Sequence, residues 1–305
     1  KGFSFLYICS HLEEISSICD RCALFTNGRV QKVLEKNELF HDPSVTYMSE
    51  YNDMVRYHTE KRERQQTAPV VFQWRGYGDE FAGKFSIDVH KGECMAIQIM
   101  NADGMEEIRG ILSGDFLPEN GDILLKGKRT KIPGNSKIAV IQERTTKTMI
   151  FPELDYMNNL CICLAEKVPS IWHNRHLRNS IRNEYSSILG PEVFDMSVDE
   201  LSEKQKYQLI YSRVMLQNPQ IVYCIKPFKG ADLAHRIHIW KLLERLLDCG
   251  ITVVDISLNL SDSLSLADRL LMIENDGTVL EIGQENFAHV PRNVPWGSFY
   301  TNIVN

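Results

Sequence analysis

The sequence has no uninterrupted apolar stretch near the roughly 20 residues that a membrane-spanning helix needs. It also has no excess of positive charge. Its 34 basic and 40 acidic side chains give a net charge of −6, which argues against general binding of nucleic acid. Hydrophobic residues are 43% and charged residues 24% of the 305 positions, as in ordinary globular proteins. This length provides enough apolar material for a large core and for two domains.

A metal-binding pattern of cysteines is also missing. The close pairs among the eight cysteines are Cys19/Cys22 and Cys161/Cys163, and neither has a second pair at the spacing of a zinc site. The segments "HNRH" and "HRIH" space two histidines as ligands on one helical turn, but no carboxylate pattern converges on either. We therefore predict no metal site, and reduced cysteines that pack as small core residues of a cytosolic protein.

Paired carboxylates are absent from the end of one predicted strand. The segment "IVYCIKPFKGAD", residues 221–232, reads as a buried strand, because its apolar, β-favouring run ends at Pro227 and Gly230. In many enzymes that act on nucleotides, such a strand ends in adjacent carboxylates, which hold a magnesium ion and orient a water. Here those two positions hold Ile225 and Lys226.

An internal repeat is present. The segment "GFSFLYICSHLEEISSICDR" aligns without gaps to "GITVVDISLNLSDSLSLADR" at an offset of 248. The identical pairs are Gly2/Gly250, Ile8/Ile256, Leu12/Leu260, Asp20/Asp268 and Arg21/Arg269. Each copy predicts a strand, a helix and a hairpin that is entered through Asp-Arg. Because solenoid repeats are only some 20 to 50 residues long, this offset indicates a duplicated domain.

The repeat divides the chain into four predicted segments. They are 1–45, the C-terminal end of a truncated first domain; 46–69, a helical and charged linker; 70–292, a second domain; and 293–305, a C-terminal tail. Lys1 falls just before the last strand–helix–hairpin unit of the first copy, so we expect most of that domain to be missing. The second domain begins with alternating strands, continues with a mostly helical stretch at 153–217 and ends with strand, helix and strand at 221–257. This order predicts an α/β domain with a helical insertion.

The order of several segments resembles that in the ATP-binding subunits of ATP-binding cassette (ABC) transporters. "VHKGECMAI" resembles the strand before the phosphate loop, "IAVIQER" the Q-loop region, "LSEKQKYQLIYSRVMLQNPQIVY" the signature helix and next strand, and "IKPFKGAD" the Walker B end and D-loop. "YICSHLEEI" looks like the switch region of a first such domain, with His11 at the switch histidine. The resemblance covers nearly the whole chain. Within this family, the chain is similar in particular to the subunits of bacterial monosaccharide importers that carry two nucleotide-binding domains in tandem.

The resemblance implies an α/β fold of the ABC-type nucleotide-binding domain. We expect a RecA-like core, an antiparallel β subdomain and a helical subdomain, preceded by the C-terminal remnant of a first such domain. By the same resemblance, the degenerate phosphate loop is Asn101, Ala102, Asp103, Gly104, Met105 and Glu106. The retained positions are Leu201, Ser202 and Gln205 of the signature, Gln142 of the Q-loop and Asp232 of the D-loop.

The departures from the family pattern argue against nucleotide binding. A working phosphate loop needs glycines, a lysine and a Ser or Thr, but Met105 takes the lysine's place and Glu106 the hydroxyl's. A carboxylate about 4 Å from a phosphate charge costs on the order of 4 kcal/mol at an effective dielectric constant near 20. Glu203 and Lys204 replace two signature glycines that let the helix N-terminus approach the γ-phosphate. We expect this domain to bind neither ATP nor Mg²⁺ well.

The leading functional hypothesis is a part of the ATP-binding subunit of a bacterial sugar importer, with a degenerate second domain. The resemblance implies ATP and Mg²⁺ in an intact first domain, head-to-tail contact between the domains, and His11 as the catalytic histidine that senses the γ-phosphate. It also implies membrane-spanning permease subunits as partners, at the inner face of the cell membrane, and no nucleic acid. An intact GxxxxGK[ST] loop upstream of Lys1 would favour this hypothesis.

The alternative is a non-hydrolysing scaffold or regulator that keeps the ABC fold for docking to a membrane or protein partner. Its functional surface would lie after Gln142, in "TTKTMIFPELDYMNN". Under either hypothesis, the vacated site poses a separate question. The family positions of Glu106 and Lys226 face one small volume, so we expect the Lys226 ammonium near the carboxylate of Glu106 or Glu107, in place of the metal. The opposing interpretation is two independent, solvated side chains.

Overall fold

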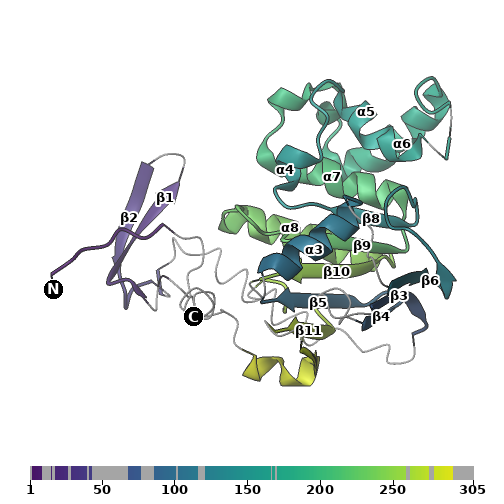
Figure 1. Cartoon of the computed structure of the whole chain (residues 1–305). Coiled ribbons are helices and arrows are strands. Elements are labelled where there is room, and N and C mark those ends of the chain that lie inside the picture. The colour runs from purple at the N-terminus through teal and green to yellow at the C-terminus, as the bar shows by residue number, and fades with distance from the viewer. Residues whose placement is uncertain are drawn as a thin grey trace. The chain divides into compact units, whose positions relative to one another are not determined.

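The structure, a computed structural model, describes residues 2–8, 15, 18–26, 29–39, 41–42, 68–76, 86–100, 102–115, 121–165, 167–168, 170–258, 262–274 and 278–290. The chain forms two compact units, one of residues 1–62 with 231–237 and the other of residues 63–230 with 238–305. Figure 1 colours the elements of both units along the chain.

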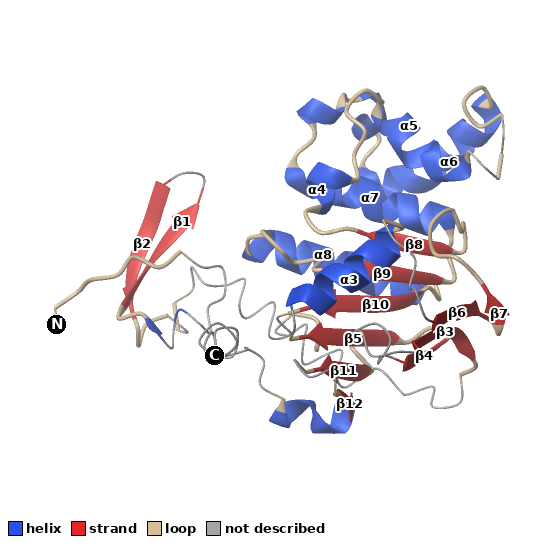
Figure 2. Cartoon of the chain, viewed as in Figure 1, coloured by secondary structure: helices blue, strands red, loops and turns tan. Residues whose placement is uncertain are grey.

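The first unit contains an antiparallel hairpin of β1 (Arg21–Thr26) and β2 (Arg29–Glu35), seen in Figure 2. Leu34 and Leu39 form its small buried cluster. Exposed apolar side chains among the described residues of this unit include Phe3, Phe5, Leu6, Ile8, Ile18, Phe25, Val30 and Val33. Residues 2–8 adopt no strand, although the repeat predicts one there. The sheet described in this unit consists of β1 and β2, and residues 2–8 are not part of it.

The second unit is built on a six-stranded sheet with the order β12-β11-β5-β10-β9-β8. Its strands are β5 (Cys94–Ile99), β8 (Ile138–Ile141), β9 (Ile221–Ile225), β10 (Thr252–Ser257), β11 (Arg269–Ile273) and β12 (Val279–Gly283). All neighbours pair in parallel except β11 and β12. The apolar runs of β5, β9 and β10 are buried along their whole length, as expected for central parallel strands covered on both faces.

A second, antiparallel sheet has the order β4-β3-β6-β7. Its strands are β3 (Val70–Gly76), β4 (Ser86–His90), β6 (Gly121–Leu125) and β7 (Lys128–Arg129). Phe72 and Trp74 of β3 are buried in the same hydrophobic cluster as Met95 and Ile97 of β5. The two sheets therefore share one core. The strands of the antiparallel sheet lie where the alternation of this region predicts them, so that prediction is confirmed.

A helical layer follows β8. It contains α4 (Thr145–Thr148), α5 (Tyr156–Cys161), α6 (Arg175–Leu189) and α7 (Glu203–Gln217), with the short 3₁₀ turns η2 (Ile162–Leu164), η3 (Glu192–Asp195) and η4 (Val198–Glu200). The layer has its own hydrophobic cluster around Tyr156 and Leu209, and it lies beyond β8 at the top of Figure 1. The prediction of a mostly helical stretch at 153–217 is confirmed.

Three further helices complete the described elements: α3 (Ala102–Ser113), α8 (Leu233–Asp248) and the 3₁₀ helix η5 (Gln284–His289). None of the described helices is both long enough and apolar enough to pass through a bilayer. The helix predicted after β10 is not found, because the described residues 262–266 are turns.

The Asp-Arg pair of the repeat has a structural role in the second unit. The Asp268 carboxylate accepts a hydrogen bond from the Cys94 backbone N–H at 2.8 Å, and the Asp268 N–H donates to the Cys94 carbonyl at 2.7 Å. Arg269 then binds Glu93, with its Nε 3.1 Å from Oε2. These contacts fix the start of β11 against the start of β5.

Candidate functional site

The predicted phosphate loop is largely replaced by helix. β5 ends at Ile99 and α3 already begins at Ala102, so only two residues separate strand from helix. Met105, at the lysine position, is buried in the core with 3% of its surface exposed. Gly104 lies within α3, and Asp103 adds an acidic side chain to the first turn. A helix in this place leaves little loop backbone to wrap a phosphate chain.

The end of β9 offers no carboxylate to a metal ion. Ile225 is the last residue of the strand and is buried, with 1% of its surface exposed. Lys226 follows with φ of 45°, in the left-handed region that non-glycine residues rarely adopt. Its backbone N–H still donates to the Ile256 carbonyl of β10 at 2.8 Å. The strand is thus bonded into the sheet, and its tip carries an apolar and a basic side chain.

The Lys226 side chain pairs with Glu143, which lies just beyond the end of β8. The Glu143 Oε2 atom lies 3.7 Å from Lys226 Nζ and 3.0 Å from Lys229 Nζ. Glu106 pairs with Arg109, whose Nε donates to Glu106 Oε2 at 2.9 Å. The ion-pair partner of Lys226 is thus Glu143, while Glu106, whose charge still acts on Lys226, binds an arginine one turn along its own helix, a favourable spacing.

The pKa directions follow from these contacts. The hydrogen bond from Arg109 lowers the pKa of Glu106, and the charges of Arg109 and Lys226 lower it further. Burial alone would raise the pKa of Glu143, but the hydrogen bond from Lys229 and the nearby positive charges lower it on balance. Burial lowers the pKa of Lys226, although Glu143 opposes the change. Lys226 thus remains electrostatically coupled to Glu106 without being its ion-pair partner.

The retained signature residues have local structural roles. Leu201 is buried in the cluster of the helical layer. Ser202 and Gln205 form a capping box at the start of α7: the Gln205 N–H donates to Ser202 Oγ at 3.3 Å, and the Ser202 N–H to Gln205 Oε1 at 2.9 Å. Glu203 and Lys204, which replace the glycines, are exposed.

Two other predicted site residues make local hydrogen bonds. Asp232 accepts a hydrogen bond from the His235 N–H at 2.9 Å and so caps α8. The Gln142 carbonyl accepts from Thr145 Oγ at 2.8 Å. His11 and Asn101 lie outside the described residues.

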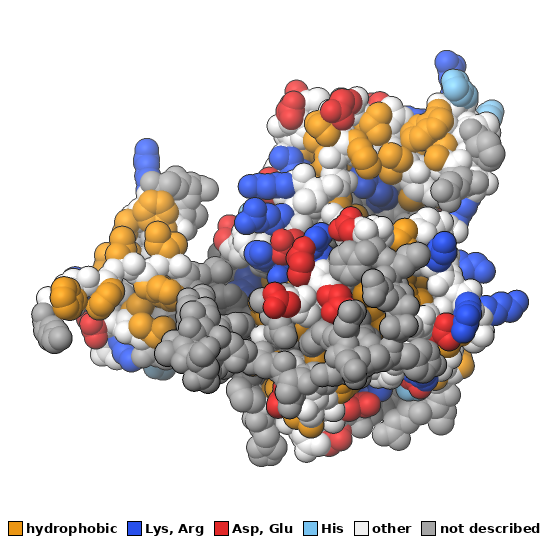
Figure 3. Space-filling model, in the orientation of Figure 1, with side chains coloured by type: hydrophobic (Ala, Val, Ile, Leu, Met, Phe, Trp, Pro, Cys, Tyr) orange, Lys and Arg blue, Asp and Glu red, His pale blue; other side chains and the backbone are white. Residues whose placement is uncertain are grey.

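These residues do not fit ATP·Mg²⁺. The position of the phosphate-binding lysine is an apolar side chain in the core, and the position of the metal-binding carboxylate is a buried isoleucine. The nearby ammonium groups of Lys226 and Lys229 are already engaged by Glu143. In Figure 3, acidic and basic side chains lie next to one another on the surface between the helical layer and the sheet. A single carboxylate, that of Glu143, thus pairs with both ammonium groups at this site.

The architecture can be compared with solved structures. An ATP-binding cassette of an ABC transporter in its ADP conformation superposes with a TM-score of 0.58 at 20% identity, covering 73% of this chain and 95% of that one. A part of an ABC transporter complex from Clostridium perfringens superposes with a TM-score of 0.57 at 16% identity, covering 72% and 90%. The fold is that of an ATP-binding cassette.

Sequence relatives extend the comparison. A ribose import ATP-binding protein of Rhizobium johnstonii is 22% identical over 294 residues, which cover 92% of this chain and 56% of the relative. A xylose import ATP-binding protein of Moorella thermoacetica is 23% identical, covering 90% and 57%, and a ribose import ATP-binding protein of Bacillus cereus is 24% identical, covering 92% and 58%. The chain thus spans little more than half the length of these relatives. No protein-family model matches the chain.

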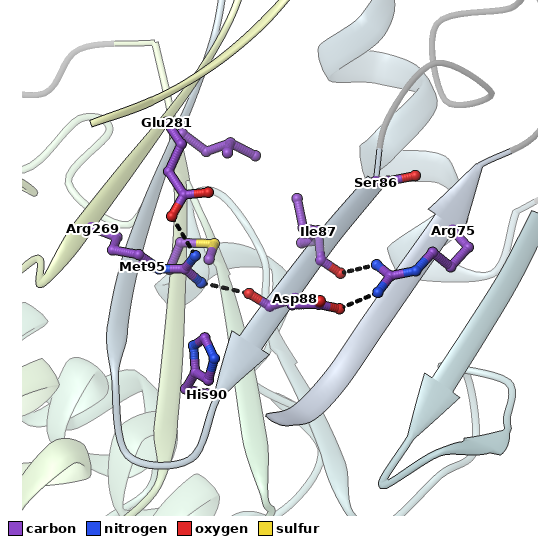
Figure 4. A pocket seen from close by; sticks show the side chains of 9 residues that line it. Arg75, Ser86, Ile87, Asp88, His90, Met95, Arg269 and Glu281 are labelled. Carbon is purple, nitrogen blue, oxygen red and sulfur yellow. Dashed lines mark hydrogen bonds and ion pairs between the residues drawn. The ribbon is translucent and has the colours of Figure 1, made fainter. Parts of the chain in front are cut away.

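A cavity of about 270 Å³ lies elsewhere in the cassette, between β3 and β4 on one side and β11 and β12 on the other (Figure 4). Arg75 donates to the Ile87 carbonyl at 3.0 Å and pairs with Asp88. Arg269 pairs with Glu281, which also lines the cavity, at 2.6 Å. It also pairs with Glu93 at 2.9 Å. Both guanidinium groups in the described lining thus form ion pairs with carboxylates. These ion pairs connect the strands of the two sheets around the cavity.

Sequence reasoning missed Asp255, a buried carboxyl in the middle of β10. It accepts hydrogen bonds from Ser257 Oγ and Ser263 Oγ, both at 2.6 Å. On balance its pKa is raised to about 6. Burial is the largest cause, the charge of Asp262 adds to the increase, and the hydrogen bonds from the two hydroxyl groups oppose it. The lone acidic residue within the apolar run "ITVVDIS" was the available signal. The carboxyl ties the end of β10 to the segment that follows it.

Proposed function

We propose that this chain forms part of the ATP-binding subunit of a bacterial sugar importer, and that its cassette is catalytically degenerate and mainly structural or regulatory. The similarity to ribose and xylose import ATP-binding proteins supports the assignment to sugar import. The observation that carries the degenerate role is the vacated site: Met105 and Ile225 are buried, and Lys226 is paired with Glu143. No catalytic step is assigned to this site.

The proposal extends to the first unit. Residues 1–45 would be the end of another nucleotide-binding domain, which would hold ATP and Mg²⁺ and meet this cassette head to tail. The repeat and the exposed apolar side chains around Phe5 and Ile8 support this view. His11 would then sense the γ-phosphate bound in that domain. Residues 46–69 would connect the two domains.

The proposed partners are the membrane-spanning permease subunits of the importer, at the inner face of the cell membrane. The surface after Gln142 supports docking there, because Phe151 exposes 43% of its surface directly after Ile150, which packs against the core of the helical layer. The same exposed side chain favours a second candidate function, a non-hydrolysing scaffold that docks to a membrane or protein partner. An intact phosphate loop elsewhere in the full-length protein would favour the importer subunit.

Titration of the 305-residue chain with ATP·Mg²⁺ tests the degenerate site. We expect a dissociation constant no tighter than about 1 mM, equivalent to roughly 4 kcal/mol of binding free energy, and no release of phosphate. Isothermal titration calorimetry and a phosphate-release assay measure both quantities. Micromolar binding that Glu143→Gln or Lys226→Gln alters would overturn the degenerate assignment. Binding that neither change alters would point to the first unit instead.

A further inference from the structure

The chain passes from β8 into the helical layer through a short segment that we call the strap, residues 142–151, which includes α4. The layer has its own hydrophobic cluster, separate from the cluster that the two sheets share. A layer with a separate core can shift relative to the sheet unless its connections are fixed. The contacts of the strap therefore help to decide how firmly the layer is held.

The strap is fixed to the sheet by charge. Lys226 and Lys229 both follow β9, and both pair with Glu143, at 3.7 Å and 3.0 Å. β8 and β9 are neighbouring parallel strands, so these ion pairs join two strand ends at the same edge of the sheet. The three side chains expose between 22% and 43% of their surface, which places them neither in bulk water nor in a dry core.

The other end of the strap is fixed to the helical layer by a buried arginine. Arg213 of α7 donates to the Met149 carbonyl at 2.6 Å and to the Asn159 carbonyl at 2.7 Å. Asn159 in turn accepts a hydrogen bond from the Phe151 N–H at 3.0 Å, and the guanidinium group of Arg213 lies 5.6 Å from the Phe151 ring centroid. The strap is thus held at both ends, by charges at the sheet and by hydrogen bonds at the layer.

The backbone at the charged end is strained. Arg144 has φ of 52° and Lys226 has φ of 45°, and both are non-glycine residues in the left-handed region. Such conformations persist where surrounding contacts impose them, and they gather at functional sites. Here one strained residue directly follows Glu143 and the other is its partner. The strain is therefore located at the ion pairs themselves.

We propose that Glu143, Lys226 and Lys229 form a built-in lock that fixes the strap, and with it the helical layer, in one arrangement without nucleotide. This inference rests on the proposed degenerate site and deepens it: the helical layer presents its docking surface around Phe151 constantly, and no longer in response to ATP.

Hydrogen exchange of the full 305-residue chain, followed by mass spectrometry, tests the lock. Glu143→Gln keeps the shape of the side chain and removes its charge, so exchange in peptides covering residues 142–149 should accelerate about fivefold to tenfold. Lys229→Gln, which removes only one of the two pairs, should accelerate it about twofold to threefold. Because screening weakens charge pairs, 1 M salt should accelerate exchange in the unaltered chain more than in Glu143→Gln.

Asp195→Asn is the matched control. It breaks the surface ion pair of Asp195 with Arg182, which lies within the helical layer and away from the strap. Exchange at residues 142–149 should not change in this variant, and exchange at β10 should not change in any of them. The lock is refuted if Glu143→Gln exchanges like the unaltered chain, or if Asp195→Asn accelerates the strap equally.

Addition of ATP·Mg²⁺ separates this inference from the proposed function. With the lock in place and the site degenerate, millimolar nucleotide should leave exchange of the strap unchanged. Tight nucleotide binding together with a Glu143-dependent strap in the ATP-free chain would refute the degenerate site and leave the lock standing. If hydrogen exchange of the strap does not change in Glu143→Gln, the lock is refuted, whatever the affinity for nucleotide.

Discussion

Asp255 shows how one buried carboxyl can couple stability to pH. Burial raises its pKa from 3.8 to about 6 in the folded chain. Between these two values the folded chain keeps a proton that the unfolded chain has lost. Stability therefore falls as pH rises from about 4 to about 6, and the full penalty remains above that range. The difference in pKa corresponds to about 3 kcal/mol as an order of magnitude.

We predict that Asp255→Asn removes this pH dependence. Its unfolding free energy relative to the unaltered chain should improve by about 2 to 3 kcal/mol between pH 4 and pH 7, because asparagine has no charge to bury. Urea unfolding at pH 4.5, 5.5, 6.5 and 7.5 measures the difference. Ser263→Ala removes a hydroxyl that lowers the pKa, so it should extend the decline to higher pH. Parallel profiles for the unaltered chain and Asp255→Asn would contradict the prediction.

Arg269 joins three structural elements. Its guanidinium group pairs with Glu93 before β5 and with Glu281 of β12, and it donates to the Asp88 carbonyl of β4. Arg269→Met should cost about 2 to 3 kcal/mol of unfolding free energy, because Glu93, only 11% exposed, would lose its cation. Urea unfolding followed by tryptophan fluorescence measures the loss.

Arg129→Met provides the matched comparison. Arg129 pairs with Asp122 at 2.9 Å, but its side chain is 79% exposed. An exposed ion pair contributes about 1 kcal/mol or less, so this change should cost much less than Arg269→Met. Equal losses of unfolding free energy for the two variants would mean that burial of Glu93 does not decide how much the ion pairs of Arg269 contribute to stability.

The strands of the cassette could be predicted from the sequence because each carries a local signal. Apolar runs indicated β5, β9 and β10, and alternation between turns indicated β3, β4 and β6. The ion-pair partner of Lys226 could not be predicted, because Glu143 lies far away along the chain and is brought close only by the pairing of β8 with β9. Local reasoning placed Lys226 opposite Glu106 but could not foresee that Arg109 would occupy that carboxylate.

The early start of α3 was missed for a related reason. The family pattern predicted a loop at residues 101–106, but this chain has lost most of the glycines that hold such a loop open. Ala102, Met105 and Glu106 favour a helix, and burial of Met105 in the core stabilises that helix further. Residues 2–8 show the opposite case: their pattern matches that of β10, but they form no strand.

At the scale of the whole molecule, the two repeat copies place the same residue types in different surroundings. Ile256 lies on β10 between β5 and β9 and exposes 1% of its surface, whereas its counterpart Ile8 exposes 90%. Val253 is likewise 0% exposed, and its counterpart Phe5 is 91% exposed. The pattern that forms a sheet interior in one copy is an uncovered apolar surface in the other. Figure 3 shows hydrophobic side chains over the visible face of the β1–β2 hairpin.

This difference predicts unequal effects of one substitution at two equivalent positions. Ile256→Ala should cost about 3 kcal/mol of unfolding free energy, because it leaves a cavity in a packed core. Ile8→Ala should cost less than about 0.5 kcal/mol, because it removes a side chain that water already surrounds. Urea unfolding of both variants of the 305-residue chain, at micromolar concentration to limit association, measures the two costs. A loss at Ile8 as large as that at Ile256 would mean that the first unit already buries this position. The apolar surface would then be no evidence for a second nucleotide-binding domain.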